Sequence, residues 1–167
     1  MRLEGVIGNS PVDANTDYIE AGGVIIGVEQ RTLDAATVKE VMDKLGVPEE
    51  DRDKYLEDMP AVRAGGTEHF LSLHVFGPDR SEYLRFDNID NGKSPHYHYC
   101  TPHENFHTAE FYDVEANGNF IEWTFDRLQH RLEPMLRKAH ADEVVDNIDW
   151  AAFDSALAKA REVVASI

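Results

Sequence analysis

The pattern of hydrophobic and polar positions predicts one strand and two helices in the first third of the chain. An apolar run at 24–28 favours a β-strand, because it is rich in β-branched residues and follows a pair of glycines. Apolar residues three and four positions apart then predict a helix that begins after Thr32 or Asp34 and ends at Gly46. A second short helix, strongly acidic on its outer side, is predicted over 48–59.

Short, aromatic-rich segments from residue 68 onward are typical of β-strands. They are His69–Phe76, Glu82–Asn88 and His96–Cys100, and turn-forming residues separate them. The alternation in Phe106–Val114 adds a fourth strand. Because strands joined by short turns pair antiparallel, these segments predict a β-meander of about four strands.

Two helices are predicted in the C-terminal part of the chain. The first runs from about Phe120 to His140 and contains Pro134, which is expected to kink it. The second follows Asp149, whose carboxylate suits the N-cap position. A block of strands flanked by helices predicts an α+β fold, in which helices pack on one face of the sheet and a two-helix tail ends the chain.

Length and composition fit one domain over 1–167. The apolar fraction of 42% is enough to build one core. Residues 1–17 are rich in polar and turn-forming residues, which favours a loose N-terminal arm. The N-terminus lacks the apolar segment of a signal peptide, and no apolar run approaches the length that a membrane span needs.

The charge balance restricts the partners. Asp and Glu number 32 against 16 Lys and Arg, which gives a net charge of −16. Such a field repels phosphate backbones and anionic lipids, so we expect neither nucleic acid nor a membrane as partner, but a small molecule, with a homodimer left open. Cys100 is the only cysteine, so no internal disulfide can form, and we predict a reducing, cytoplasmic setting.

The candidate chemistry lies on the strand His96–Cys100. Side chains alternate along a strand, so His96 and His98 share one face while Tyr97 points to the other. Two imidazoles at positions i and i+2 can bind one ion, and imidazole suits Zn, Fe, Cu and Ni. The alternative is that the histidines form hydrogen bonds in a polar cavity or on a surface strand, without a metal.

The preceding strand supplies candidate partners for these histidines, because Arg85 and Asp87 share one of its faces. In a hairpin, Asp87 would flank the imidazoles, and two histidines with one carboxylate make a facial triad with open positions. Arg85 would orient an anionic substrate and Tyr97 would line the pocket, which makes Arg85, Asp87 and Tyr97 candidate catalytic residues. The alternative is that Arg85 and Asp87 take part in cross-strand salt bridges.

His74, on the strand 69–76, is a further candidate ligand. An odd separation from His69 puts these two histidines on opposite faces, so at most one of them can join the cluster. We favour His74, which shares its face with Ser72. The alternative is a histidine that only forms hydrogen bonds within the sheet.

Residues 103–107 spell H-E-x-x-H. On a helix this motif would direct His103 and His107 to one zinc ion, with Glu104 as the general base of a peptidase. Pro102 directly precedes the motif and residues 108–114 alternate like a strand, which argues against a long helix here. The peptidase therefore stays a minor alternative. His103 and His107 remain candidate ligands from a loop, and Glu104 remains a candidate catalytic residue.

The segments Leu84–Asp87 and Pro95–Tyr99, followed by a helix that Trp123 leads, also carry a resemblance. They resemble a group of short, uncharacterised, mostly bacterial proteins, in which an R-F-D strand precedes a P-H-Y-H-Y strand. The resemblance covers about residues 68–140 and brings no assigned activity. It implies that four residues belong together: Arg85, Asp87, His96 and His98.

Three functions follow from these observations. The leading hypothesis is a small metal-dependent enzyme, in which a divalent transition metal (Zn, Fe, Cu or Ni) at the histidine-rich strand acts on a small anionic molecule. The second is a metal-free small-molecule-binding or dimerisation module with a polar histidine core and no cofactor. The third is a zinc peptidase built on 103–107.

Overall fold

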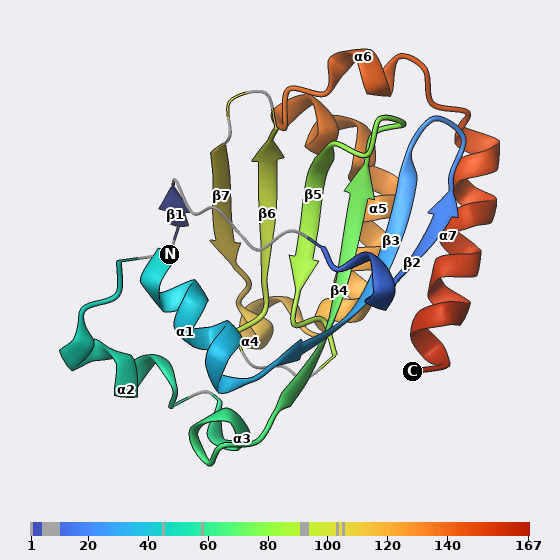
Figure 1. Ribbon diagram of the computed structural model, residues 1–167. Helices are drawn as coiled ribbons and strands as arrows, with labels where there is room; N and C mark the ends of the chain where they lie inside the picture. Colours follow the sequence, from blue (N-terminus) through green and yellow to red (C-terminus); the bar gives the residue numbers. More distant parts are fainter. Residues whose placement is uncertain are drawn as a thin grey trace.

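A seven-stranded sheet forms the centre of the computed structural model, which describes residues 2–4, 11–44, 46–57, 59–90, 94–102, 104 and 106–167. The strand order is β1-β7-β6-β5-β4-β3-β2, and all neighbouring strands pair antiparallel (Figure 1). The strands are β1 (Arg2–Glu4), β2 (Thr16–Glu20), β3 (Ile25–Leu33), β4 (Glu68–Phe76), β5 (Glu82–Asp87), β6 (His96–Thr101) and β7 (Phe106–Phe111).

The predicted meander is confirmed in its order, but the prediction of about four strands is wrong. The four predicted strands are β4 to β7, and β3 contains residues 25–28 of the apolar run predicted at 24–28. The sheet continues on both sides, because β1 pairs with β7 while β3 and β2 follow β4. Short polar strands such as β1 and β2 carry little hydrophobic alternation, so their pairing depends on backbone hydrogen bonds that the sequence pattern does not reveal.

The predicted loose arm over 1–17 is also wrong for the part of it that the structure describes. Arg2 lies opposite Glu110 on β7, and Thr16 lies opposite Glu29 on β3. Between them, the backbone N–H of Val12 donates to Oε1 of Glu29 at 2.8 Å. These described residues are therefore integral to the sheet and to its buried polar face.

Two long helices pack against the sheet: in Figure 1, α5 (Phe120–Lys138) lies behind the strands and α7 (Trp150–Ala165) stands at the right, beside β2. Both predicted helices are confirmed, and α5 continues through Pro134. The predicted N-cap is confirmed as well, since Oδ1 of Asp149 accepts hydrogen bonds from the backbone of Ala151 and Ala152. Buried residues of both helices, such as Leu128 and Phe153, join the strands in one hydrophobic core.

The remaining helical segments are short. Asp34 precedes α1 (Ala35–Lys44) and accepts a hydrogen bond from the backbone N–H of Thr37, which confirms it as one of the two predicted caps. The predicted helix over 48–59 is reduced to a 3-10 turn, η2, and one turn of α-helix, α2. These segments are η1 (Asp13–Asn15), η2 (Glu49–Asp51), α2 (Arg52–Tyr55), α3 (Pro60–Arg63), α4 (Val114–Asn117) and α6 (Asp142–Val145). None of the helices in the described part of the chain is long and apolar enough to cross a membrane.

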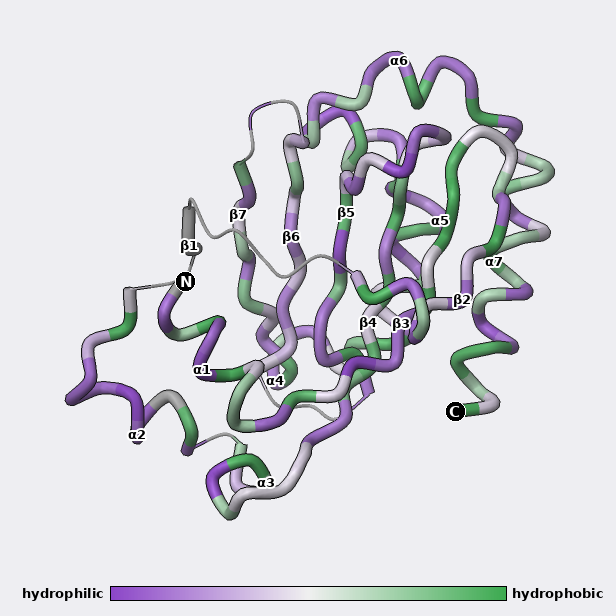
Figure 2. The backbone as a smooth tube through the Cα atoms, in the orientation of Figure 1, coloured by the Kyte–Doolittle hydropathy of each residue, from purple (hydrophilic) through white to green (hydrophobic). Residues whose placement is uncertain are grey.

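The sheet has two chemically different faces. The face toward α5 and α7 is apolar, and it includes Leu73 and Val75 of β4 and Phe86 of β5. The opposite face carries buried polar side chains, and Figure 2 shows hydrophilic positions along β5 and β6 in the middle of the sheet. These buried polar residues include Glu29, Ser72, His74, Arg85, Asp87 and His98. Buried charges require partners, and clusters of buried titratable groups often mark functional sites, so this face carries the candidate site.

Candidate metal centre

Asp87, His96 and His98 form a cluster of metal-ligating side chains on the polar face. The β5–β6 register places Asp87 directly opposite His96. One ligand atom of each residue lies within 4.8 Å of the other two. Oδ2 of Asp87 is 3.2 Å from Nε2 of His98 and 3.6 Å from Nε2 of His96. The structure therefore brings together the two histidines and the carboxylate that the sequence predicts as a facial triad.

The cluster is buried at the sheet and open at one side. Asp87 is 7% exposed and His98 is 4% exposed. The side chain of His96 is 21% exposed, so solvent reaches the cluster there. The ring of Phe111 stacks against His96, with ring centroids 5.5 Å apart.

The ring nitrogens of the two histidines have different surroundings. Nδ1 of His96 lies 2.8 Å from the backbone carbonyl oxygen of Ser94, and since that oxygen can only accept, Nδ1 carries the proton. Nε2 of His96 then presents its lone pair toward Asp87, which is the arrangement that metal-ligating histidines use. Nδ1 of His98 is buried and has no hydrogen-bond partner among the described residues. The nitrogen of His98 that faces Asp87 is Nε2, so a metal bound through Nε2 would leave Nδ1 without a partner among the described residues.

The electrostatics favour the protonation states that metal binding needs at two members of the triad, Asp87 and His96. Burial alone would raise the pKa of Asp87, but the hydrogen bond from His98 and the positive charge of Arg85 outweigh it and hold the pKa well below its usual value. Burial lowers the pKa of His96, although the charge of Asp87 opposes this shift. An ionised carboxylate and a neutral imidazole are both competent ligands, so the donor set fits a divalent transition metal.

Arg85 does not face an open site. Its side chain is 1% exposed, and its Nε and Nη2 donate to the two carboxylate oxygens of Glu82 at 2.9 and 2.5 Å. The two-pronged geometry that would suit a substrate carboxylate is thus used within the protein. Asp87, on the same strand, acts on Arg85 through its charge.

His74 lies on the same face as the cluster, as predicted, but outside it. Its Nδ1 is 2.6 Å from Oε1 of Glu82, and its Nε2 is 3.0 Å from Oε2 of Glu29. Both ring nitrogens are therefore engaged by carboxylates, and no lone pair is directed to the triad. Burial would raise the pKa of Glu82, but His74 and Arg85 outweigh it and lower the pKa to about 2.

Sequence reasoning missed three residues of this face: Glu29, Ser72 and Glu82. Glu29 joins the network from a strand that is 45 residues from His74 in the chain. Ser72 donates from its Oγ to Oδ1 of Asp87 at 2.6 Å. Strand alternation already places Ser72 on the face of His74, and a polar residue at such a position in an otherwise apolar strand is the available signal.

The H-E-x-x-H segment does not form a helix where the structure describes it. His107 lies on β7, and Oε1 of Glu104 bonds instead with Nδ1 of His140 at 3.0 Å on the surface. His103 lies outside the described residues. Nδ1 of His107 is 3.7 Å from Sγ of Cys100, and its ring centroid is 6.2 Å from that of His98. His107 is thus a neighbour of the triad, while Glu104 is not.

Tyr97 points to the opposite face of the sheet, as strand alternation predicts. Its ring packs against Phe86 and against Trp123 of α5, with ring centroids 6.0 and 5.2 Å apart. The structure therefore does not bring Tyr97 to the triad. Its role as a pocket-lining residue is not supported by this placement.

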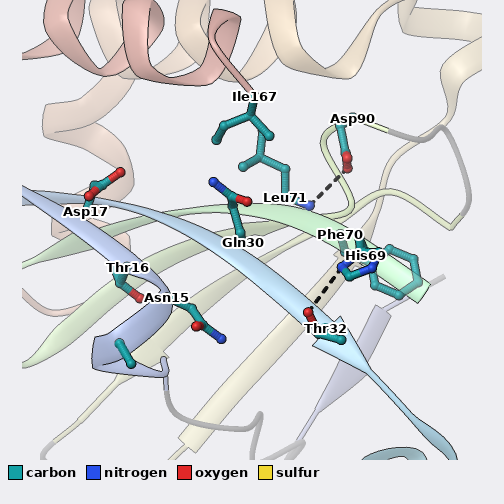
Figure 3. Close-up of a pocket in the computed structure, with 11 residues that line it drawn as sticks. Asn15, Thr16, Asp17, Gln30, Thr32, His69, Phe70, Leu71, Asp90 and Ile167 are labelled. Carbon is teal, nitrogen blue, oxygen red and sulfur yellow. Dashed lines mark hydrogen bonds between the residues drawn. The ribbon is translucent and has the colours of Figure 1, made fainter. Parts of the chain in front are cut away.

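A cavity of about 440 Å³ lies away from the triad (Figure 3). It is near the C-terminal Ile167, and polar side chains such as Asp17, Gln30 and His69 line it. Gln30 shares the face of Val28, which belongs to the hydrophobic core, so strand alternation puts it on the side of α7. Asp87, His96 and His98 are not among the residues that line this cavity.

The family comparison covers almost the whole chain. A family model described as "Domain of unknown function (DUF7700)" matches residues 18–164, which includes the triad and both long helices. No curated protein and no solved structure matches the chain. The family match agrees with the resemblance to an uncharacterised group, and it carries no activity. By this match over most of its length, the chain belongs to the DUF7700 family.

Proposed function

We propose that Asp87, His96 and His98 bind one divalent transition metal, and that the protein is a small metal-dependent enzyme acting on an anionic small molecule. The observation that carries this proposal is the convergence of three ligand atoms within 4.8 Å of one another. Two imidazole nitrogens and one carboxylate oxygen suit Zn, Fe, Ni or Cu and leave coordination positions open. At such a position a metal acts as a Lewis acid or activates water.

The charges of the polar face favour an anionic ligand at the loaded centre. Glu29 is bonded to Arg31 and His74, and Glu82 is bonded to His74 and Arg85. Asp87 is the acidic residue that directs an oxygen to the ring nitrogens of the triad. The two positive charges of a divalent ion would exceed the single negative charge of Asp87. The loaded centre would then carry a net positive charge, which attracts anions or hydroxide.

Metal content is the first test. Protein purified without a histidine tag is loaded with Zn²⁺, Fe²⁺, Ni²⁺ or Cu²⁺, desalted and analysed by elemental mass spectrometry. We expect about one equivalent in the wild-type protein and loss of binding in His96→Ala and His98→Ala, because two ligands alone hold such ions weakly. His130→Ala is the matched control, since His130 also lies beside a carboxylate, Asp126, at 3.1 Å but on the surface of α5. Unchanged metal content in both triad variants would place any bound metal elsewhere.

Catalysis is tested on the same variants. The metal-loaded protein is assayed for turnover of small anionic compounds, namely phosphate esters and 2-oxo acids, with His98→Ala as the blank. We expect turnover that requires both the metal and His98. Stoichiometric metal without turnover of any anionic compound would contradict the enzymatic part and leave a metal-binding protein.

The buried network also favours a second candidate, a metal-free module with a polar histidine core. His74 is fully buried, and the carboxylates of Glu29 and Glu82 satisfy it without an ion. This candidate predicts that chelators leave the melting temperature unchanged and that the oligomeric state changes between about pH 6 and pH 8, where histidines titrate. A chelator-induced drop in the melting temperature would contradict it.

A further inference from the structure

The two carboxylate oxygens of Asp87 have different partners. Oδ1 accepts a hydrogen bond from Oγ of Ser72 at 2.6 Å. Oδ2 faces the ring nitrogens of His96 and His98 at 3.6 and 3.2 Å. A carboxylate held in this way directs one oxygen, and not both, to the centre of the cluster.

Ser72 is placed for this contact by the sheet. It lies on β4, and the β4–β5 register with Leu73 opposite Phe86 brings Ser72 to the level of Asp87. Ser72 is fully buried, and its neighbours on the same face of β4 are Phe70 and His74. A buried hydroxyl is costly without a partner, and in this strand the partner is the candidate ligand.

We propose that Ser72 is a positioning residue, which keeps Asp87 a one-oxygen ligand and so sets the coordination number of the bound metal. This inference rests on the proposed metal centre. With Oδ1 held by the hydroxyl, Asp87 donates through Oδ2 and leaves coordination positions for substrate or water. Without the hydroxyl, the carboxylate is able to rotate and bind through both oxygens, which occupies one of those positions. Outer partners of this kind typically change metal affinity by about 10- to 100-fold.

The experiment uses Co²⁺ as the probe, because its visible absorption reports coordination number. Ser72→Ala, Ser72→Thr and Ser72→Val are titrated with Co²⁺ beside the wild-type protein. Thr and Val have nearly the same shape and add the same crowding at this buried position, so their difference isolates the hydroxyl. We expect Ser72→Thr to keep the wild-type spectrum and affinity. Ser72→Val and Ser72→Ala should bind about 10- to 100-fold more weakly, with weaker bands that indicate a higher coordination number.

Thr108→Val is the matched control for loss of a buried hydroxyl in the sheet. Thr108 is 5% exposed, and its Oγ1 has no hydrogen-bond partner among the described residues. This variant should leave the Co²⁺ spectrum unchanged.

The outcomes separate the two proposals. No Co²⁺ binding by the wild-type protein would contradict the metal centre itself. Wild-type binding together with identical spectra and affinities for Ser72→Thr and Ser72→Val would overturn the role of Ser72 alone. If Ser72→Ala does not fold, circular dichroism shows it, and the Thr and Val pair still decides.

Discussion

Glu82 shows how one buried carboxylate organises the polar face at the scale of single residues. Its Oε1 accepts from the ring of His74 and from Nε of Arg85, and its Oε2 accepts from Nη2 of Arg85. Its side chain is 12% exposed, so solvent screens these interactions only weakly. Removing one partner of such a network leaves the others buried without compensation, which is costly.

Glu82→Gln should therefore destabilise the protein in a pH-dependent way. The pKa of Glu82 is lowered from 4.5 to about 2, so its ionised form is favoured by folding. Its contribution is fully present above about pH 4.5 and is lost as the pH falls toward 2. We expect Glu82→Gln to lower the free energy of unfolding by roughly 3 kcal/mol at pH 7, with the difference shrinking on acidification.

Chemical denaturation of both proteins between pH 7 and pH 2.5 measures this difference. Glu20→Gln serves as the control, because Glu20 is exposed on the edge strand β2. If Glu82→Gln lowers the free energy of unfolding by the same amount at every pH in this range, the destabilisation comes from altered packing and not from the lost charge.

At the scale of elements, helix α7 depends on a defined start. Oδ1 of Asp149 accepts from the backbone N–H groups of Ala151 and Ala152, two donors that have no partner inside the helix. Gly22 and Gly23, in the β2–β3 turn, lie against the residues that precede α7. A Cβ on Gly22 would be 2.6 Å from the carbonyl oxygen of Asp149. The β2–β3 turn and the start of α7 are thus fitted to each other.

Asp149→Ala should cost about 1 kcal/mol of unfolding free energy, which is typical for loss of an N-cap. Asp154→Ala, an exposed carboxylate on the same helix, should change stability by less than about 0.5 kcal/mol. Urea unfolding followed by circular dichroism compares the two. Equal effects of both substitutions would mean that net charge, and not the cap, determines the change.

At the scale of the whole molecule, the net charge of −16 opposes compaction. Ion pairs such as Arg137 with Asp142 and Asp146 compensate part of the acidic surface locally. The remaining carboxylates repel one another over distances that salt screens.

Added salt should therefore stabilise the protein. Raising NaCl from about 20 mM to 500 mM shortens the screening length several-fold and should raise the melting temperature by several degrees. Differential scanning calorimetry of the chelator-treated protein measures this without a contribution from metal binding. A melting temperature that falls with salt would mean that attractive ion pairs, and not repulsion, dominate.

The local pattern predicted those parts of the fold that depend on neighbours in the chain. Alternation of period two put His96 and His98 on one face and Tyr97 on the other, and the structure has this arrangement. The helical spacing and the cap at Asp149 likewise predicted α7. The pairing of β1 with β7 and of β2 with β3 was not predicted, because short polar strands carry too few apolar positions to show a period.

The sequence by itself determined which side chains could share a face, and in this way the candidate ligands Asp87, His96 and His98. Only the tertiary structure decided which of these side chains contact one another, since strand register is set by burial and pairing over the entire sheet. It brought Ser72 and not Arg85 into hydrogen-bond contact with Asp87, and it directed both nitrogens of His74 to carboxylates. A period of two fixes the face of a side chain, whereas its partner comes from another strand, at a distance along the chain that no local pattern encodes.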